Sequence, residues 1–250
     1  MNHYKVLHVA RSGGHVFLNW IMFHYDKAVH SNCVKHPDPG SFKITRFWMP
    51  DLMDKRIDGT VRLVKGEAVD PRISNDRACL KRHSFPCWVM SVEDCRNPGA
   101  EGMWDLDWGP KPEHSQQVYL IRSYLNTMAS RVKDDSKRPS RPPRKGPCLW
   151  KEHARAAFES GCYVWFDLFI ESADYRREVE EMLGLPRMPE RDEQSLGVVA
   201  PDAGGSSFNG TRLDEVRAGV HRRYEEVELP DGWADDQEAF RLEDLIRREQ

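Results

Sequence analysis

Residues 4–21 read YKVLHVARSGGHVFLNWI, in which an apolar run is followed by a polar turn and then by a second apolar pattern. The run Val6–Ala10 predicts a strand, and Gly13 and Gly14 let the backbone turn sharply after it. Between Val16 and Tyr25 the apolar residues recur at the spacing of a helix. The segment therefore predicts a strand, a tight turn and an amphipathic helix.

A second segment repeats this order. Residues 118–131 read VYLIRSYLNTMASR, which predicts a buried strand over Val118–Ile121 and a helix over Tyr124–Lys133. An arginine follows each strand, Arg11 in the first segment and Arg122 in the second. Helix N-termini and guanidinium groups both bind anions, so the two turns together predict a ligand with phosphate at two places.

The rest of the chain continues the alternation of strands and helices. Strands are predicted near Phe42–Phe47, Thr60–Val64, Trp88–Val92 and Tyr163–Phe166, and helices over Trp150–Glu159 and Ser172–Leu183. Ser172 has the residue type of an N-cap, and Gly184 that of a helix end. This order predicts an α/β fold with a mostly parallel central sheet and helices on both faces. Ligands bind such sheets at the carboxyl ends of the strands.

Length and the distribution of proline and charge define the expected domain organisation. We expect one domain over residues 1–250, with a variable acceptor-pocket region over 31–117. Residues 134–148 are rich in proline and arginine, and the stretch up to Pro147 is expected to form neither helix nor central strand. We interpret it as a mobile basic loop, either simply solvated or a lid over an anion. The tail from Leu213 is charged and expected to be helical.

Composition excludes several classes of protein. Hydrophobic residues make up 39%, charged residues 31%, and the net charge is −3, so a general nucleic-acid binder is not expected. No apolar run approaches the roughly 18 residues of a membrane span. The N-terminal residues lead directly into a strand without a secretory pattern, and six scattered cysteines suit a reducing compartment, so we expect a cytoplasmic protein.

A third segment adds a candidate base. Residues 81–86 read KRHSFP and precede the predicted strand Trp88–Val92. Lys81 and His83 are two residues apart, so they lie on the same side of an extended chain. A base next to a cation suits group transfer to a hydroxyl.

In this order the three segments resemble the PAPS-dependent sulfotransferases, where PAPS is 3′-phosphoadenosine 5′-phosphosulfate. Residues 11–15, RSGGH, resemble the family's 5′-phosphosulfate loop K/R-S-G-T/S-x. Arg122 and Ser130 match the arginine and serine that hold the 3′-phosphate, with the same spacing of eight. Residues 81–86 resemble the K-T-H-x-x-P segment that carries the base. The resemblance covers about residues 4–210 and implies the P-loop NTPase-like sulfotransferase fold.

The resemblance also implies roles for individual residues. PAPS is the implied co-substrate, and no metal is required. The residues implied in donor binding are Arg11, Ser12, Gly13, Gly14, His15, Arg122 and Ser130, with Gly205, Ser206 and Ser207 in a loop that closes over the adenosine. The implied catalytic residues are His83, Lys81 and Arg11, with His36 or Glu93 as alternative bases. The implied reaction transfers a sulfuryl group to a hydroxyl or amine of a small-molecule or carbohydrate acceptor.

Departures from the family pattern leave alternatives open. Gly14 and His15 replace residues that often carry hydroxyls, and the C-terminal R-K-G-x-x-G loop is absent, so an inactive nucleotide-binding protein of this fold is an alternative. A small-molecule kinase is disfavoured because there is no G-x-x-x-x-G-K-[ST]. Two weaker alternatives are a zinc site at Cys79, His83, Cys87 and Cys95 and a carboxylate pair among Glu101, Asp105 and Asp107. The sequence determines neither the acceptor nor the oligomeric state.

Overall fold

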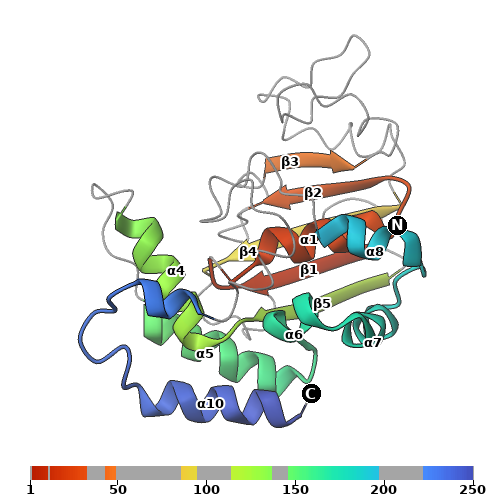
Figure 1. Ribbon diagram of the computed structural model, residues 1–250. Helices are drawn as coiled ribbons and strands as arrows, with labels where there is room; N and C mark the ends of the chain where they lie inside the picture. Colours follow the sequence, from red (N-terminus) through yellow and green to blue (C-terminus); the bar gives the residue numbers. More distant parts are fainter. Residues whose placement is uncertain are drawn as a thin grey trace.

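The computed structural model describes residues 2–10, 12–32, 43–48, 86–94, 114–136, 146–196 and 222–249. Within these residues six strands form one sheet in the order β3-β2-β4-β1-β5-β6 (Figure 1). The strands are β1 Asn2–His8, β2 Ala28–Asn32, β3 Lys43–Trp48, β4 Cys87–Glu93, β5 His114–Ile121 and β6 Tyr163–Trp165. All neighbouring pairs are parallel except β2 and β3, which are antiparallel. The predicted mostly parallel α/β sheet is confirmed.

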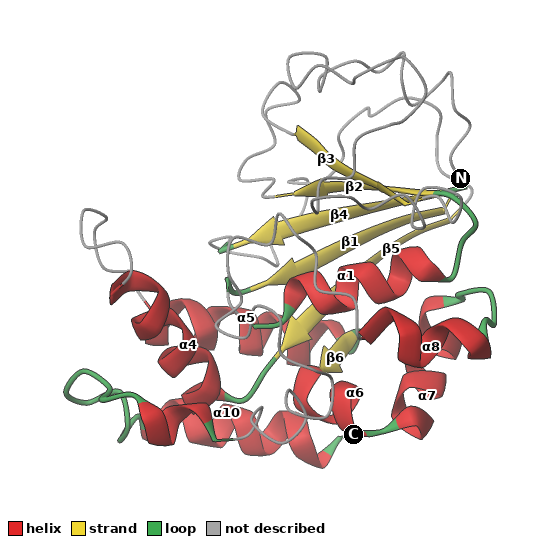
Figure 2. Cartoon of the chain, turned by 45° about the horizontal axis from the view of Figure 1, so that its top comes forward, coloured by secondary structure: helices red, strands yellow, loops and turns green. Residues whose placement is uncertain are grey.

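The described helices follow β1, β5 and β6. They are α1 Gly14–Phe23, α4 Tyr124–Ser136, α5 Gly146–Ser160, α6 Phe166–Glu171, α7 Ala173–Leu183, α8 Pro189–Leu196, α10 Gln237–Arg248 and the 3-10 helix η2 Arg223–Glu226. Helix α1 packs against β4, β1 and α8, whereas α5 packs against β5, β6 and α10 (Figure 2). No helix within the described segments is long and apolar enough to cross a membrane.

The topology brings the ends of three strands together. From β1 the chain crosses through α1 towards β2, and from β5 it crosses through α4 and α5 in the opposite direction to β6. Both crossovers are expected to be right-handed, which places their helices on opposite faces of the sheet. Strands β4 and β5 flank β1 in register, so Glu93, His8 and Leu120 lie side by side. This is the point of an α/β sheet where ligands bind.

The central strands are buried because helices cover both faces. In β4 every residue from Cys87 to Val92 is buried, and in β1 Tyr4, Val6 and Leu7 are completely buried. Near-continuous apolar runs of this kind are typical of parallel strands covered on both sides. The buried centre of the sheet therefore ends at the carboxyl edge, where the turns that follow β1 and β5 begin.

The predicted caps of α7 are confirmed. The Ser172 hydroxyl accepts a hydrogen bond from the Tyr175 N–H at 3.1 Å, and Gly184 ends the helix in the left-handed conformation with φ 60°. Strand β3 also lies where a strand was predicted, over Lys43–Trp48. Local capping and alternation were sufficient signals for these elements.

Several predicted boundaries were wrong. Strand β1 ends at His8 rather than Ala10, because the Ala10 N–H donates to the Asp94 carboxylate instead of continuing the ladder. Strand β2 was not predicted, since its short sequence AVHSN lacks clear alternation. Phe166 begins α6 instead of ending a strand. Helix α8 was not predicted, and residues 228–235 of the tail are not helical.

The expectation that residues 134–148 form a loop was wrong at both ends. Helix α4 continues to Ser136, with Asp134 buried, and α5 already begins at Gly146. Pro147 is compatible with this start because the first turn of a helix does not use its N–H groups. The middle of the stretch, like the strand predicted over Thr60–Val64, lies outside the described residues.

Candidate functional site

The first loop joins β1 to α1 and is shaped by close packing on its glycines. Gly13 is the N-cap of α1 and has φ 93°, a backbone conformation that favours glycine. A Cβ built on Gly13 would lie 2.3 Å from the Phe166 ring, and one on Gly14 would lie 2.3 Å from the His8 ring. The two glycines therefore let the loop lie directly on two aromatic rings.

Ser12 precedes these glycines and is itself buried. Its N–H donates to the Val9 carbonyl at 3.1 Å, which tightens the turn. Ser12 is 1% exposed, and its buried hydroxyl has no hydrogen-bond partner among the residues that the structure describes. A buried hydroxyl in that state is costly unless a ligand satisfies it. The loop thus offers a polar group next to the positive end of the α1 dipole.

The second loop joins β5 to α4 and is built on buried charge. Arg122 is 1% exposed, and its Nη1 donates to the Ser130 Oγ at 3.4 Å. The structure thus brings these two side chains together, as their proposed role at one phosphate requires. Trp150 anchors the loop from α5, since its Nε1 donates to the Arg122 carbonyl at 2.9 Å.

An aromatic ring and a carboxylate hold the guanidinium in place. The Arg122 Cζ lies 5.7 Å from the centroid of the Phe166 ring, and its Nε lies 3.5 Å from the Asp167 Oδ1. Gly13 packs against the same Phe166 ring. The two loops therefore meet at one side chain, although their arginines are far apart in sequence.

An ion pair between the buried Arg131 and the partly exposed Asp94 links the loops a second time. The Asp94 carboxylate accepts hydrogen bonds from the Ala10 N–H and from the Arg131 Nη1, both at 2.8 Å. Arg131 is 1% exposed and follows Ser130 in α4. Asp94, with φ 52°, also donates its N–H to the His8 carbonyl at 3.1 Å. The end of β4 thus ties the first loop to the helix of the second.

A histidine and a glutamate lie beside this clamp. The His8 ring is buried, and its Nε2 is 2.9 Å from the Ser91 Oγ and 4.0 Å from the Glu93 Oε1. The other ring nitrogen is 3.2 Å from the Val9 carbonyl. Glu93 has a 19% exposed side chain. A carboxylate therefore lies at the same edge as the two loops.

The amides at the start of α4 already bind carboxylates. The Ser123 N–H donates to Asp167 at 2.8 Å, and the Tyr124 N–H donates to Glu243 of α10 at 2.9 Å. Burial raises the pKa of Glu243, although the hydrogen bond from Tyr124 lowers it. A pocket of about 610 Å³ lies next to these groups and is lined by both carboxylates. The carboxylates that line this pocket repel phosphate. An anion at the second loop must therefore bind to the Arg122 and Ser130 side chains.

Comparison with solved structures finds sulfotransferases. The sulfotransferase domain of the Synechococcus PCC 7002 olefin synthase matches with a TM-score of 0.56 at 11% identity, covering 99% of this chain and 94% of that one. The sulfotransferase domain from the curacin biosynthetic pathway has a TM-score of 0.55 at 13% identity and covers 98% and 96%. Mouse sulfotransferase SULT7A1, complexed with PAP, has a TM-score of 0.55 at 12% identity and covers 99% and 89%. The chain has the sulfotransferase fold.

Comparisons based on the sequence alone find no relative, in contrast to the comparison of structures. No family model matches it, and none of the curated proteins matches it. The sulfotransferase fold was nevertheless predicted from three short segments. At identities of 11–13% the likeness to these structures is one of fold.

The structure brings together part of the predicted site. Gly13 and Arg122 meet at Phe166, Ser130 contacts Arg122, and Gly14 packs on His8. His15, on the first turn of α1, faces β2, where its ring lies edge-on to that of His30 with centroids 6.5 Å apart. The predicted site residues outside the described part of the sulfotransferase fold are Arg11, Lys81, His83, Gly205, Ser206 and Ser207, together with the alternative base His36.

Four residues of this edge carried little or no signal in the sequence. Phe166 and Asp167 reach the loops from α6, His8 from β1, and Asp94 from the residue after β4. Among the described residues no group of three or more histidine, cysteine, aspartate or glutamate side chains is arranged to hold a metal ion. Cys87, the one member of the suggested zinc group that the structure describes, is buried in β4, which raises the pKa of its thiol. The suggested carboxylate pair lies outside the described residues.

Proposed function

We propose that this chain transfers a sulfuryl group from PAPS to a hydroxyl or amine of a small-molecule or carbohydrate acceptor. The observation that carries the proposal is that Gly13 and Arg122 pack on one ring, Phe166. Two anion-binding turns in contact through one side chain suit one ligand with phosphate at both ends of its ribose. ATP lacks a 3′-phosphate and would leave the second turn unused.

The residues present fit this donor. Ser12 has a buried hydroxyl that the described residues leave unsatisfied, and Gly13 lets the first loop pack on the Phe166 ring that also contacts Arg122. We propose that the first loop, Arg11 to His15, binds the 5′-phosphosulfate, and that Arg122 and Ser130 bind the 3′-phosphate. PAPS supplies the sulfuryl group, with 3′-phosphoadenosine 5′-phosphate (PAP) as the leaving group. Arg11 and Lys81 would stabilise the charge that develops on that leaving group.

The loop that carries Gly205, Ser206 and Ser207 remains our proposal for closing over the adenosine. The short polar side chains and glycines of residues 204–210 suit backbone contacts to a ribose and a base. Its test is limited proteolysis of the full chain with and without PAP. Protection of this stretch by PAP is expected, and cleavage at an unchanged rate contradicts the role.

Isothermal titration calorimetry with PAP, ATP and ADP tests the donor assignment without knowledge of the acceptor. We expect PAP to bind at least about 100-fold more tightly than ADP, because the 3′-phosphate adds charge-assisted hydrogen bonds worth about 3 kcal/mol. Equal affinity for PAP and ADP would contradict the proposal. Binding of ATP in preference to PAP would favour a kinase.

A second candidate is a nucleotide-binding protein of the same fold without transfer activity. The observation that favours it is the contact between Gly14 and the His8 ring, which leaves no room for a hydroxyl-bearing side chain at this position. Release of PAP from PAPS distinguishes the two candidates, because only a transferase turns PAPS over. Tight PAP binding without turnover on any acceptor would support the second candidate.

A further inference from the structure

The position of β4 decides which residues reach the donor loops. Pro86, just before β4, lies at the amino edge of the sheet, where its carbonyl accepts a hydrogen bond from the Asn2 N–H at 2.7 Å. Strand β4 then runs parallel to β1 for its whole length and ends at Glu93 beside His8. Segment 81–86, with the predicted base, precedes the strand. Along this part of the chain, Glu93 is the first carboxylate to reach the carboxyl edge.

Contacts place the Glu93 carboxylate beside the first loop. Its Oε1 is 4.0 Å from the His8 Nε2, and the same imidazole touches the position of a Gly14 Cβ. One imidazole ring therefore separates the carboxylate from the first turn of α1, where we place the phosphosulfate. The neighbouring carboxylate, Asp94, has a different task, because it binds Ala10 and Arg131.

We infer that Glu93, rather than His83, is the general base of the transfer, an assignment that rests on the proposed function. The acceptor oxygen or nitrogen attacks sulfur and forms the new bond. The bond between sulfur and the bridging oxygen of the 5′-phosphate breaks, and its electron pair stays on PAP. The acceptor's proton passes to a carboxylate oxygen of Glu93. A base in this role contributes on the order of 10²–10⁴ in rate.

His8 positions this carboxylate. The ring is 1% exposed and is held between the Ser91 hydroxyl and the Val9 carbonyl. The same fixed ring lies 4.0 Å from the Glu93 carboxylate and against Gly14, so that the base and the loop share a single rigid support. A carboxylate held in this way keeps its direction when the acceptor arrives.

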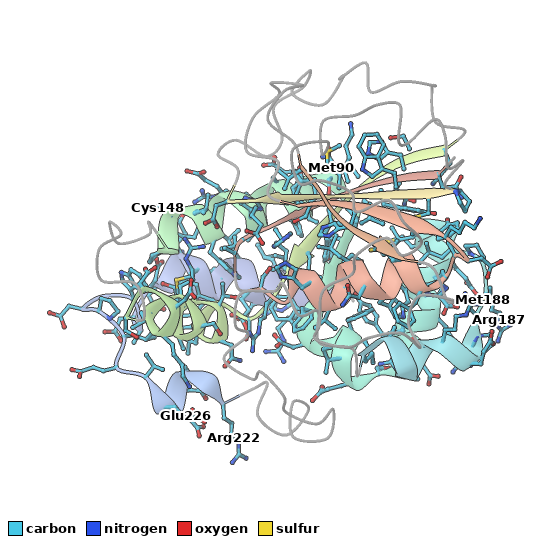
Figure 3. All side chains as sticks on the ribbon, turned by 90° about the horizontal axis from the view of Figure 1, so that it is seen from above. Met90, Cys148, Arg187, Met188, Arg222 and Glu226 are labelled. Atoms are coloured by element: carbon cyan, nitrogen blue, oxygen red, sulfur yellow. The ribbon has the colours of Figure 1, made fainter. Side chains whose placement is uncertain are left out.

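The chain contains a matched control for this pair. His24 and Glu180 form a second buried pair, with the His24 Nε2 3.8 Å from the Glu180 Oε1 and side chains 2% and 10% exposed. His24 caps the other end of α1 and binds the carbonyl of Pro186, next to Arg187 and Met188. Arg187 and Met188 lie at the opposite end of the molecule from Cys148 at the start of α5 (Figure 3).

The test compares Glu93→Gln with Glu180→Gln in the full chain. Transfer is measured as release of PAP from PAPS, with water alone and with phenol, ethanolamine and glucosamine as acceptors. We expect Glu93→Gln to lower kcat by at least about 100-fold, and Glu180→Gln to leave it unchanged. Formate added to Glu93→Ala should restore part of the rate, which a merely structural role would not allow.

PAP affinity provides a readout that does not depend on turnover. Glu93→Gln should bind PAP as tightly as the wild type or more tightly, because it removes a negative charge beside the 5′-phosphate. Transfer retained by Glu93→Gln, or lost by His83→Ala alone, would overturn the assignment. So would a wild type that binds PAP but releases none from PAPS with any of these acceptors. A wild type that does not bind PAP would instead overturn the proposed function.

Discussion

The two loops that meet at Phe166 are built by different means. The first loop depends on shape, because Gly13 and Gly14 lie against aromatic rings with no space for a Cβ. The second depends on charge, because a buried Arg122 is balanced by Asp167 and directed at Ser130. The proposed ligand site therefore depends on two independent properties, the lack of space beside the glycines and the buried charge of Arg122. Added volume should break the first loop, and removed charge should break the second.

The largest effect is expected for Gly13→Ala. The new Cβ overlaps the Phe166 ring, and alanine is strained at φ 93°. Together these costs should lower the free energy of unfolding by about 3 kcal/mol or more. Urea denaturation measures the loss. Gly161→Ala is the matched control, since Gly161 has φ 64° but no atom within 4 Å of a new Cβ. If both variants lose equal stability, packing on Phe166 does not shape the loop.

Arg122→Ala should weaken PAP binding by about 100-fold, because a charge-assisted hydrogen bond is worth about 1.5–3 kcal/mol. Binding of AMP, which has no 3′-phosphate, should change much less. Arg155→Ala serves as the control, since Arg155 pairs with Glu238 on the exposed face of α5. The double variant Arg122→Ala/Asp167→Asn removes the buried carboxylate charge as well and should keep the fold stable for the titration. An equal loss for PAP and AMP would show that Arg122 does not read the 3′-phosphate.

Asp94→Asn tests whether the loops act as one unit. Asparagine tolerates the positive φ and still accepts from the Ala10 N–H, but it leaves the buried Arg131 without its carboxylate. We expect a loss of about 2 kcal/mol in stability and about tenfold in PAP affinity. Thermal unfolding and calorimetry measure the two effects. Unchanged PAP affinity at reduced stability would show that the clamp serves only the fold.

The smallest effect is expected for Glu243→Gln, behind the second loop. Burial raises the pKa of Glu243 above its ordinary value of 4.5, so ionisation costs more in the folded state than in the unfolded state. Wild-type stability should therefore fall as pH rises from about 4.5 through the raised pKa. Glutamine still accepts from the Tyr124 N–H, so the variant should be more stable at pH 7 and equal to the wild type near pH 4. Denaturation across this pH range measures the difference, and a variant less stable at pH 7 would contradict the assignment.

The sequence by itself determined the local elements around the site. Val118–Ile121 followed by an amphipathic pattern was enough to predict a strand and a helix, and the resemblance to the sulfotransferases paired Arg122 with Ser130, whose side chains are in contact. Ser172 and Gly184 marked the ends of α7 in the same way. These features depend on neighbours within two or three turns of the chain, so the information is local.

The tertiary structure alone decided how these elements are joined. Phe166 lies between two loops more than a hundred residues apart, and Asp94 ties Ala10 to Arg131. Neither contact has a periodicity or a motif, because each depends on which strands become neighbours in the sheet. The position of Glu93, which was predicted only as an alternative base, was decided in the same way. It lies near the first loop because β4 pairs with β1 in a register that sets Glu93 beside His8.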